Sequence, residues 1–292
     1  MKRSWLWTSL AVGLVPGIAH AEPVVFEPAG NWVMEYGEDS CVLGRQFSSG
    51  DESALLQLLQ FGPGNDFELR ISSTVRLPNR NVSVSYAPGA EGMVRNPDQI
   101  EMADGTKGLL LSAESMRPEI ADAARSGTTP AWSVADRDLR EKTAVRIVVN
   151  GGGGKSVVLA TGSLHPAMSA MRTCIGDLAV TWGLDGDANV SLSREAALAD
   201  FQKLEKAGYG DDVPAFFKAM NGKVLRLRVF IDAEGTPSRC TIAAPDDVET
   251  YVKQLCDSFL SGTGIPALDA SGKPIASVMT RTLTYRVVTK SF

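Results

Sequence analysis

The spacing of apolar residues changes near residue 164, and this change constrains the fold more than any other feature of the chain. Before it, short apolar or alternating runs are separated by Gly, Pro, Asn and Asp, as is typical of strands joined by turns. In residues 67–71 the apolar and charged side chains alternate, so they fall on opposite faces of a strand. We expect strands over residues 32–36, 40–47, 55–61, 66–77, 82–86 and 108–113.

Beyond residue 163 the apolar period becomes helical. Apolar residues recur every three or four positions and predict a helix over residues 166–182, which begins at Pro166 and is followed by Gly183. A helical turn is also expected over 118–125, whereas the charged stretch 136–142 is too short to assign. The helix is marked by Met168, Met171, Ile175, Leu178 and Trp182.

Residues 145–149 and 155–164 are predicted to form a hairpin around four consecutive glycines. Glycines followed by Lys155 and Ser156 suggest a phosphate-binding loop, but that motif needs a further glycine where Val149 stands. It also needs a helix after the loop, and the following apolar run is typical of a strand. We therefore interpret the glycines as a flexible turn.

The predicted fold class is α+β, with two domains. A leader (1–21) precedes a β-rich N-terminal domain (22–183) that ends in the amphipathic helix. Residues 184–212 form a linker and a helix, and a small β-β-α-β domain occupies 213–292. The polar stretch 183–193 is interpreted as the joint, after which Ser193 is expected to cap a helix that ends at Gly208. That helix would carry Glu195, Leu198, Phe201 and Leu204.

The first 21 residues predict an export signal. Lys2 and Arg3 precede an apolar stretch, and Ala19 and Ala21 stand where signal peptidase accepts small residues, so cleavage is expected after Ala21. The apolar stretch of about eleven residues is too short to span a bilayer as a helix. We expect a periplasmic protein without an integral membrane segment after cleavage; an uncleaved membrane anchor is the alternative.

Four cysteines in an oxidising compartment predict two disulfides, and three pairings are possible. Cys240 and Cys256 lie on a predicted strand and the next helix, only 16 positions apart, so they are the first choice. Cys41–Cys174 follows by elimination and would tie the helix predicted over 166–182 to the second predicted strand, over 40–47. The two crosslinks would contribute roughly 3 and roughly 4–5 kcal/mol by constraining the unfolded chain. Zinc is disfavoured because there is no CxxC motif.

Composition disfavours several function classes. The formal net charge is −5, which argues against nucleic-acid binding because phosphate neutralisation needs a basic face. His165 is the only histidine beyond the leader and is interpreted as a surface residue at a helix start. The Asp269 turn lacks the Asp-Thr/Ser-Gly of aspartic proteases. We predict no catalytic residues, cofactor or metal site; a hydrolase using carboxylates such as Asp66, Glu68 and Asp98 is an alternative.

The last eighty residues contain the most specific pattern. Residues 222–235 predict a strand closed by an acidic turn at Gly235, and residues 238–243 predict the strand that returns from it. Asp246 and Asp247 then precede an apolar helix face formed by Val248, Val252, Leu255 and Phe259. Pro266-Ala267-Leu268 and Gly272-Lys273-Pro274 follow, before a final strand over about 277–288.

This order of elements, with G-x-V-x-x-x-V-x-I-D-x-x-G, P-A-L and G-K-P, resembles the C-terminal domain of the TonB family over residues 213–288. The cysteine pair resembles a subgroup of exported TonB-like proteins in which a disulfide links the second strand to the helix. The resemblance implies a protein that binds a partner peptide by adding a strand to a sheet edge.

The expected edge is the last strand, with Val278, Thr280, Thr282, Thr284 and Arg286 as the partner-binding residues. The expected partner is an envelope protein or peptide, with an outer-membrane protein as one candidate; pairing of this edge within a homodimer is the competing interpretation. A membrane-anchored TonB-type energy transducer is a further alternative. It is disfavoured because the leader is predicted to be cleaved and no Pro-rich spacer follows it.

Overall fold

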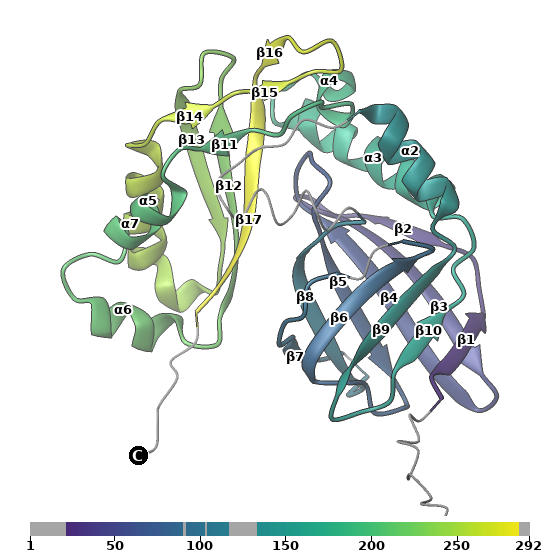
Figure 1. Cartoon of the computed structure of the whole chain (residues 1–292). Coiled ribbons are helices and arrows are strands. Elements are labelled where there is room, and N and C mark those ends of the chain that lie inside the picture. The colour runs from purple at the N-terminus through teal and green to yellow at the C-terminus, as the bar shows by residue number, and fades with distance from the viewer. Residues whose placement is uncertain (1–21, 90–91, 103, 117–132, 286–292) are drawn as a thin grey trace, which may run out of the picture.

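The structure of the chain is a computed structural model that describes residues 22–89, 92–102, 104–116 and 133–285. It has the strand-rich α+β composition predicted from the sequence. Figure 1 shows a curled sheet with helices over one end, and beside it a smaller sheet with its own helices. Three predictions concern residues outside the described ranges: the leader at 1–21, the helical turn at 118–125 and the part of the last strand after residue 285.

A mixed sheet of ten strands forms the N-terminal part of the structure. Its order is β6-β9-β10-β1-β3-β4-β5-β8-β7, and β2 pairs with β3 beside this path. Strands β1 and β10 are parallel, and the other neighbours are antiparallel. The strands are β1 (Val24–Pro28), β2 (Val33–Tyr36), β3 (Cys41–Ser49), β4 (Glu52–Gln60), β5 (Phe67–Ser73), β6 (Arg80–Ala87), β7 (Asp98–Glu101), β8 (Lys107–Glu114), β9 (Arg146–Gly152) and β10 (Val157–Leu159).

The curled sheet surrounds the first hydrophobic core. Its strands alternate side chains between two faces, and Leu56 and Leu58 on β4 and Leu69 on β5 are fully buried on the inner one. The curl brings β6 close to β5 and β8. The rings of Tyr86 and Phe67 meet edge to face with centroids 6.0 Å apart, and the Tyr86 hydroxyl donates to Glu114 of β8 at 3.4 Å. The predicted strands in this region are confirmed, as is the hairpin of β9 and β10. Strands β1 and β7 were not predicted.

Helix α3 (His165–Thr181) confirms the helix predicted over 166–182. Pro166 occupies its first turn, and Gly183 follows its end with φ +83°, a conformation that favours glycine. Its inward face packs on the first core through Met168, Met171, Ile175 and Leu178. The helix lies over one end of the curled sheet (Figure 1).

Two further helices flank α3. Helix α2 (Val134–Thr143) includes the charged stretch that the sequence left unassigned, and the Ser133 hydroxyl caps it by accepting a hydrogen bond from Asp136 N. Helix α4 (Gly186–Val190) lies in the polar stretch interpreted as a joint. It packs closely on α3, because a Cβ at Gly186 would lie 2.7 Å from the carbonyl oxygen of Gly176. We refer to residues 24–190 as the N-terminal unit.

The C-terminal unit (residues 192–285) surrounds a second hydrophobic core. Its sheet has the order β13-β12-β17, all antiparallel, and α7 covers one face. Leu225, Leu227 and Val229 from β12 and Leu255 and Phe259 from α7 are completely buried between them. The elements are β11 (Ala197–Leu198), α5 (Phe201–Ala207), α6 (Val213–Met220), β12 (Val224–Ile231), β13 (Pro237–Ala243), η1 (Asp246–Val248), α7 (Glu249–Leu260), β14 (Gly264–Ile265), β15 (Ala267–Leu268), β16 (Pro274–Ile275) and β17 (Ser277–Thr284).

The helix expected to start at Ser193 was placed too early. The backbone around residues 194–199 instead pairs with residues 263–268, and Ser193 Oγ donates to Asp269 O. The helix α5 begins only at Phe201, after Asp200 adopts a positive φ of 55°. Long-range main-chain pairing therefore replaces the local capping that the sequence suggests.

Both predicted disulfides are present. Cys41–Cys174 joins β3 to α3, with the two Cα atoms 6.1 Å apart. Cys240–Cys256 joins β13 to α7, with a Cα separation of 5.4 Å. Each therefore fixes a helix to a sheet, and disulfides are compatible with an exported protein. None of the helices in the described ranges is long and apolar enough to cross a membrane.

Candidate functional site

The face of the C-terminal sheet that does not contact α7 lies against the N-terminal unit. Glu68 on β5 is 1% exposed and receives two hydrogen bonds from Arg226 of β12, with Nε and Nη2 at 2.9 and 2.8 Å. Arg70 donates to the same carboxylate at 3.1 Å, and the hydroxyl of Thr282 donates at 2.9 Å. This buried carboxylate accepts four hydrogen bonds, and three of them, two from the Arg226 guanidinium and one from Thr282, join the two units.

Arg228, two positions further along β12, makes a second contact between the units. Its Nε donates to Phe61 O at 2.7 Å, and its Nη2 donates to Asp39 O. The guanidinium lies between aromatic rings, 5.2 Å from the Trp182 centroid and 5.6 Å from that of Phe61. Burial lowers the pKa of Arg228, while Asp39 acts in the opposite direction. Leucines and arginines thus alternate along β12. The leucines pack in the apolar core beneath α7, and the arginines lie at the polar contact with the N-terminal unit.

The residues predicted to bind a partner lie on β17. Val278, Thr280 and Thr282 share the face toward the N-terminal unit, where Val278 is 1% exposed. Thr280 packs so closely on Gly62 that a Cβ there would lie 2.3 Å from its methyl group. Thr284 ends the strand, and Arg286 lies outside the described residues. The side chains of this face therefore contact the other half of the chain, while β17 itself is the terminal strand of its sheet.

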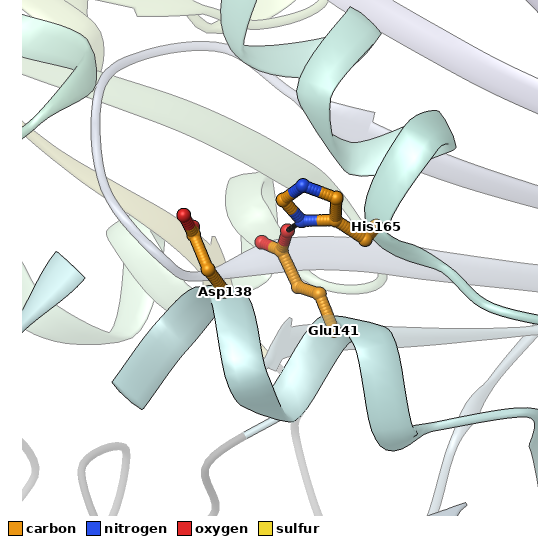
Figure 2. A group of neighbouring side chains, drawn as sticks. All are labelled: Asp138, Glu141 and His165. Atoms are coloured by element: carbon orange, nitrogen blue, oxygen red, sulfur yellow. Dashed lines mark hydrogen bonds and ion pairs between the residues drawn. The ribbon is translucent and has the colours of Figure 1, made fainter. Parts of the chain in front are cut away.

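A cluster of ionisable side chains lies where α2 meets the start of α3. Figure 2 shows Glu141 of α2 pointing toward the imidazole of His165, with Asp138 one turn away. His165 Nδ1 is 3.0 Å from Glu141 Oε2, and Arg172 contacts both carboxylate oxygens at 2.5 and 3.0 Å. The structure thus places His165, predicted as a surface residue, beside a buried carboxylate; its side chain is 28% exposed.

The cluster has the residue types of a metal site, because one ligand atom from each of Asp138, Glu141 and His165 lies within 4.8 Å of the others. Its partners argue for ion pairing instead. Both oxygens of Glu141 accept hydrogen bonds from Arg172, and Asp138 accepts two from Arg137. A cation would have to displace guanidinium groups that already neutralise the two carboxylates.

The carboxylates proposed for a hydrolase are not brought together. Glu68 is bound by arginines, and Asp98 lies on β7, the terminal strand of the sheet, two strands away from β5. Asp66 lies beside Glu195, which the sequence analysis placed in a helix and not in a site, and Glu195 Oε1 accepts a hydrogen bond from Asn65 N at 2.6 Å. Burial, followed by the charge of Asp66, raises the pKa of Glu195 to about 7. This carboxyl pair lies at the contact between the two units.

The remaining motifs have structural roles. The glycines at 151–154 turn β9 into β10, as predicted. Asp269 closes the turn between β15 and β16, where its Oδ1 accepts hydrogen bonds from Ser271 N and Lys273 N. Hydrogen bonds from the Ser271 hydroxyl and from the backbone N–H groups of Lys273 and Ser271 lower the pKa of Asp269.

Two adjoining cavities lie where the β4–β5 loop faces helices α2, α3 and α4. Gln60, Gly64, Asn65, Arg137 and Arg172 line both of them. The larger has a volume of about 30 Å³, and Met116, Met168 and Glu141 also line it. The sequence did not single out these residues, because an arginine on a helix is usually part of a solvated face.

No family model, curated protein or solved structure matches this chain.

Proposed function

We propose that this chain is a non-enzymatic protein of the periplasm, exported with cleavage after Ala21, that binds an envelope protein by edge-strand pairing at β17. The observation that carries the proposal is the position of β17. It is the terminal strand of the C-terminal sheet and pairs with β12 over all eight residues without a register shift. A regular terminal strand leaves alternate main-chain N–H and C=O groups directed away from the sheet, where a partner strand can bind.

The opposite edge of the same sheet is less suited to pairing. Strand β13 begins at Pro237, which has no N–H, and its register with β12 shifts between Phe230 and Ile231. The exposed Arg239 lies beside that shift. Proline, bulges and charged side chains are the devices by which sheets protect their edges. Strand β17 has neither proline nor register shift, and its one charged residue, Arg281, is half-buried. A partner strand is therefore expected at β17.

The packing of β17 also suggests how a partner would be recognised. One face of the strand contributes Met279 and Leu283 to the core, and the other contacts the N-terminal unit. With both faces covered, affinity would come mainly from main-chain hydrogen bonds, and this suits an extended peptide segment such as one from an outer-membrane protein. The resemblance to the TonB C-terminal domain, together with the disulfides, supports this class of partner.

Paired proline variants test the edge. Consecutive residues of a strand direct their N–H groups to opposite sides, so Thr280→Pro and Arg281→Pro each remove one N–H, one toward β12 and one toward the outer edge of the sheet. We expect one variant to be destabilised and the other to fold but to lose its partner in pull-down from an envelope extract. Thr280→Ala and Arg281→Ala control for the lost side chains. Equal recovery of the partner by the folded proline variant would refute edge pairing.

Two further measurements separate the alternatives. N-terminal sequencing of the native protein should begin at Glu22; a sequence that begins at Met1 would instead support an anchored energy transducer. A concentration-dependent dimer that disappears in the folded proline variant would show that the edge pairs with a second copy of this chain.

A hydrolase is the second candidate, favoured only by the Asp66–Glu195 pair. A carboxyl group with a pKa near neutrality beside a second carboxylate is suited to general acid–base catalysis. Incubation with cell-wall fragments and unstructured peptides should detect turnover that Glu195→Gln abolishes. If no substrate is turned over, the non-enzymatic function is preferred.

A further inference from the structure

The two disulfides differ in their exposure to solvent. Cys41 and Cys174 are completely buried in the first hydrophobic core. Cys240 and Cys256 are both partly exposed, and Cys240 packs at the margin of the second core. Thiol–disulfide exchange requires a thiolate to reach a sulfur atom, so exposed disulfides are the labile ones. A reductant can therefore reach the second pair in the folded chain, whereas the first pair requires an opening of its core.

Packing holds Cys240 and Cys256 close together independently of their bond. Helix α7 is anchored by Leu255, the neighbour of Cys256, and by Phe259 one turn later, and both are completely buried. The ring of Phe259 also stacks on that of Phe201, with centroids 5.2 Å apart. Strand β13 is held by its antiparallel pairing with β12. The bond can therefore open and close again without unfolding of the C-terminal unit.

Strand β13 is the element that depends most on this crosslink. All seven of its residues are partly or well exposed, whereas most residues of β12 are buried. It is a terminal strand of its sheet, and its register with β12 shifts between Phe230 and Ile231. Without the disulfide, its attachments to the rest of the unit are the pairing with β12 and the packing of side chains such as Ile242 on the second core. Loss of the bond should therefore increase local opening of β13.

We propose that Cys240–Cys256 is a reversible redox site on which a dithiol acts, and that its reduction releases β13 from α7. One thiolate of the dithiol attacks a sulfur of the pair and forms a mixed disulfide, while the other cysteine leaves as a thiolate. The second thiolate of the dithiol then displaces the first cysteine. The dithiol loses two electrons and becomes a disulfide, and its two protons end on the two cysteine thiols. The site is independent of partner binding at β17.

Timed reduction of the oxidised full-length protein tests the site, and the buried pair is the internal control. The protein is treated with dithiothreitol without denaturant, quenched with excess iodoacetamide and mapped by mass spectrometry. We expect Cys240 and Cys256 to be alkylated at least about tenfold faster than Cys41 and Cys174, because the buried pair needs an opening of the first core. Tryptophan fluorescence should stay native meanwhile. Labelling of all four cysteines at one rate, or loss of the native spectrum in step with labelling of Cys240, would overturn the proposal.

Hydrogen exchange measures the consequence for β13. In protein reduced at Cys240 and Cys256 alone, the amides of residues 238–243 should exchange faster than in the oxidised protein, while those of β4 should be unchanged. The double variant Cys240→Ser, Cys256→Ser should exchange in β13 like the reduced wild type and should not respond to dithiothreitol. Unchanged exchange in β13 of the reduced wild type would overturn the release of this strand.

Reoxidation tests reversibility. After removal of dithiothreitol, oxidised glutathione should restore the Cys240–Cys256 link, and any other pairing would overturn the proposal. A protein dithiol with a Cys-x-x-Cys motif, compared with dithiothreitol at equal concentration, identifies the kind of reductant. Faster reduction by the protein supports a protein dithiol, and faster reduction by dithiothreitol supports a small one.

Discussion

Substitution of Glu68 by Gln should weaken the contact between the two units. Glu68 is 1% exposed and accepts four hydrogen bonds, two from Arg226, one from Arg70 and one from Thr282. Glutamine has nearly the same shape, but it is neutral and directs an NH₂ group toward a guanidinium. The change therefore removes the charge and at least one acceptor while it leaves the volume unchanged.

The expected cost follows from the burial of the partners. Breaking a buried ion pair by removing one member costs roughly 3–5 kcal/mol. The side chain of Arg226 is 25% exposed, so water solvates part of the charge that remains, and we expect about 2 kcal/mol. For a chain of this size, that corresponds to a fall in melting temperature of about 4–8 °C.

A double-mutant cycle separates this interaction from other effects of the substitution. Urea unfolding of Glu68→Gln, Arg226→Met and the double variant, followed by circular dichroism with the disulfides intact, should give a coupling energy of about 1.5–3 kcal/mol. Lys253 and Asp257 form the control pair. Their side chains are 75% and 61% exposed, and the coupling between exposed ions is expected to be below about 0.5 kcal/mol. A coupling between Glu68 and Arg226 as small as that of the control would refute the reasoning.

Three further predictions concern the same contact and the crosslinks. The folded chain retains a proton on Glu195 up to a pKa of about 7, against an ordinary value of 4.5, so its stability should fall as pH rises between these values. Glu195→Gln should reduce this fall in urea unfolding measured from pH 5 to pH 8, and an unchanged pH dependence would contradict the prediction. Gly64→Ala should destabilise by about 1–3 kcal/mol, because φ is +140° and a Cβ would lie 2.6 Å from Glu195 Oε1; a melting temperature within 1 °C of wild type would contradict this contact. Replacement of Cys41 and Cys174 together by Ser should lower unfolding stability by roughly 4–5 kcal/mol, and mapping of disulfides in the wild type by mass spectrometry should find these two residues linked to each other.

Local patterns were sufficient to predict much of the fold. The alternating runs of the first half form β2 to β6 and β8, because alternation buries one face of a strand whatever its neighbours are. The boundaries of α3 follow from Pro166 and Gly183, whose backbone preferences act locally. Where long-range pairing competes with local signals, the prediction was wrong, as at Ser193. Helix α2 was missed since its charged residues are ordered by contacts with distant segments, such as Arg137 with Val190 O.

The sequence by itself determined the α+β class and, through position and elimination, the two disulfide pairs, because these depend on periodicity and on residues near one another in predicted elements. The candidate sites depend on tertiary structure. Arg226 and Arg228 alternate with leucines as they would on a solvated strand face, and only the approach of β5 places Glu68 against one of them. Asn65 and Arg172 are more than one hundred positions apart, and they line one cavity only because the β4–β5 loop folds over α3. Burial strengthens the hydrogen bonds and ion pairs of these polar residues, and they become buried only when the chain is folded.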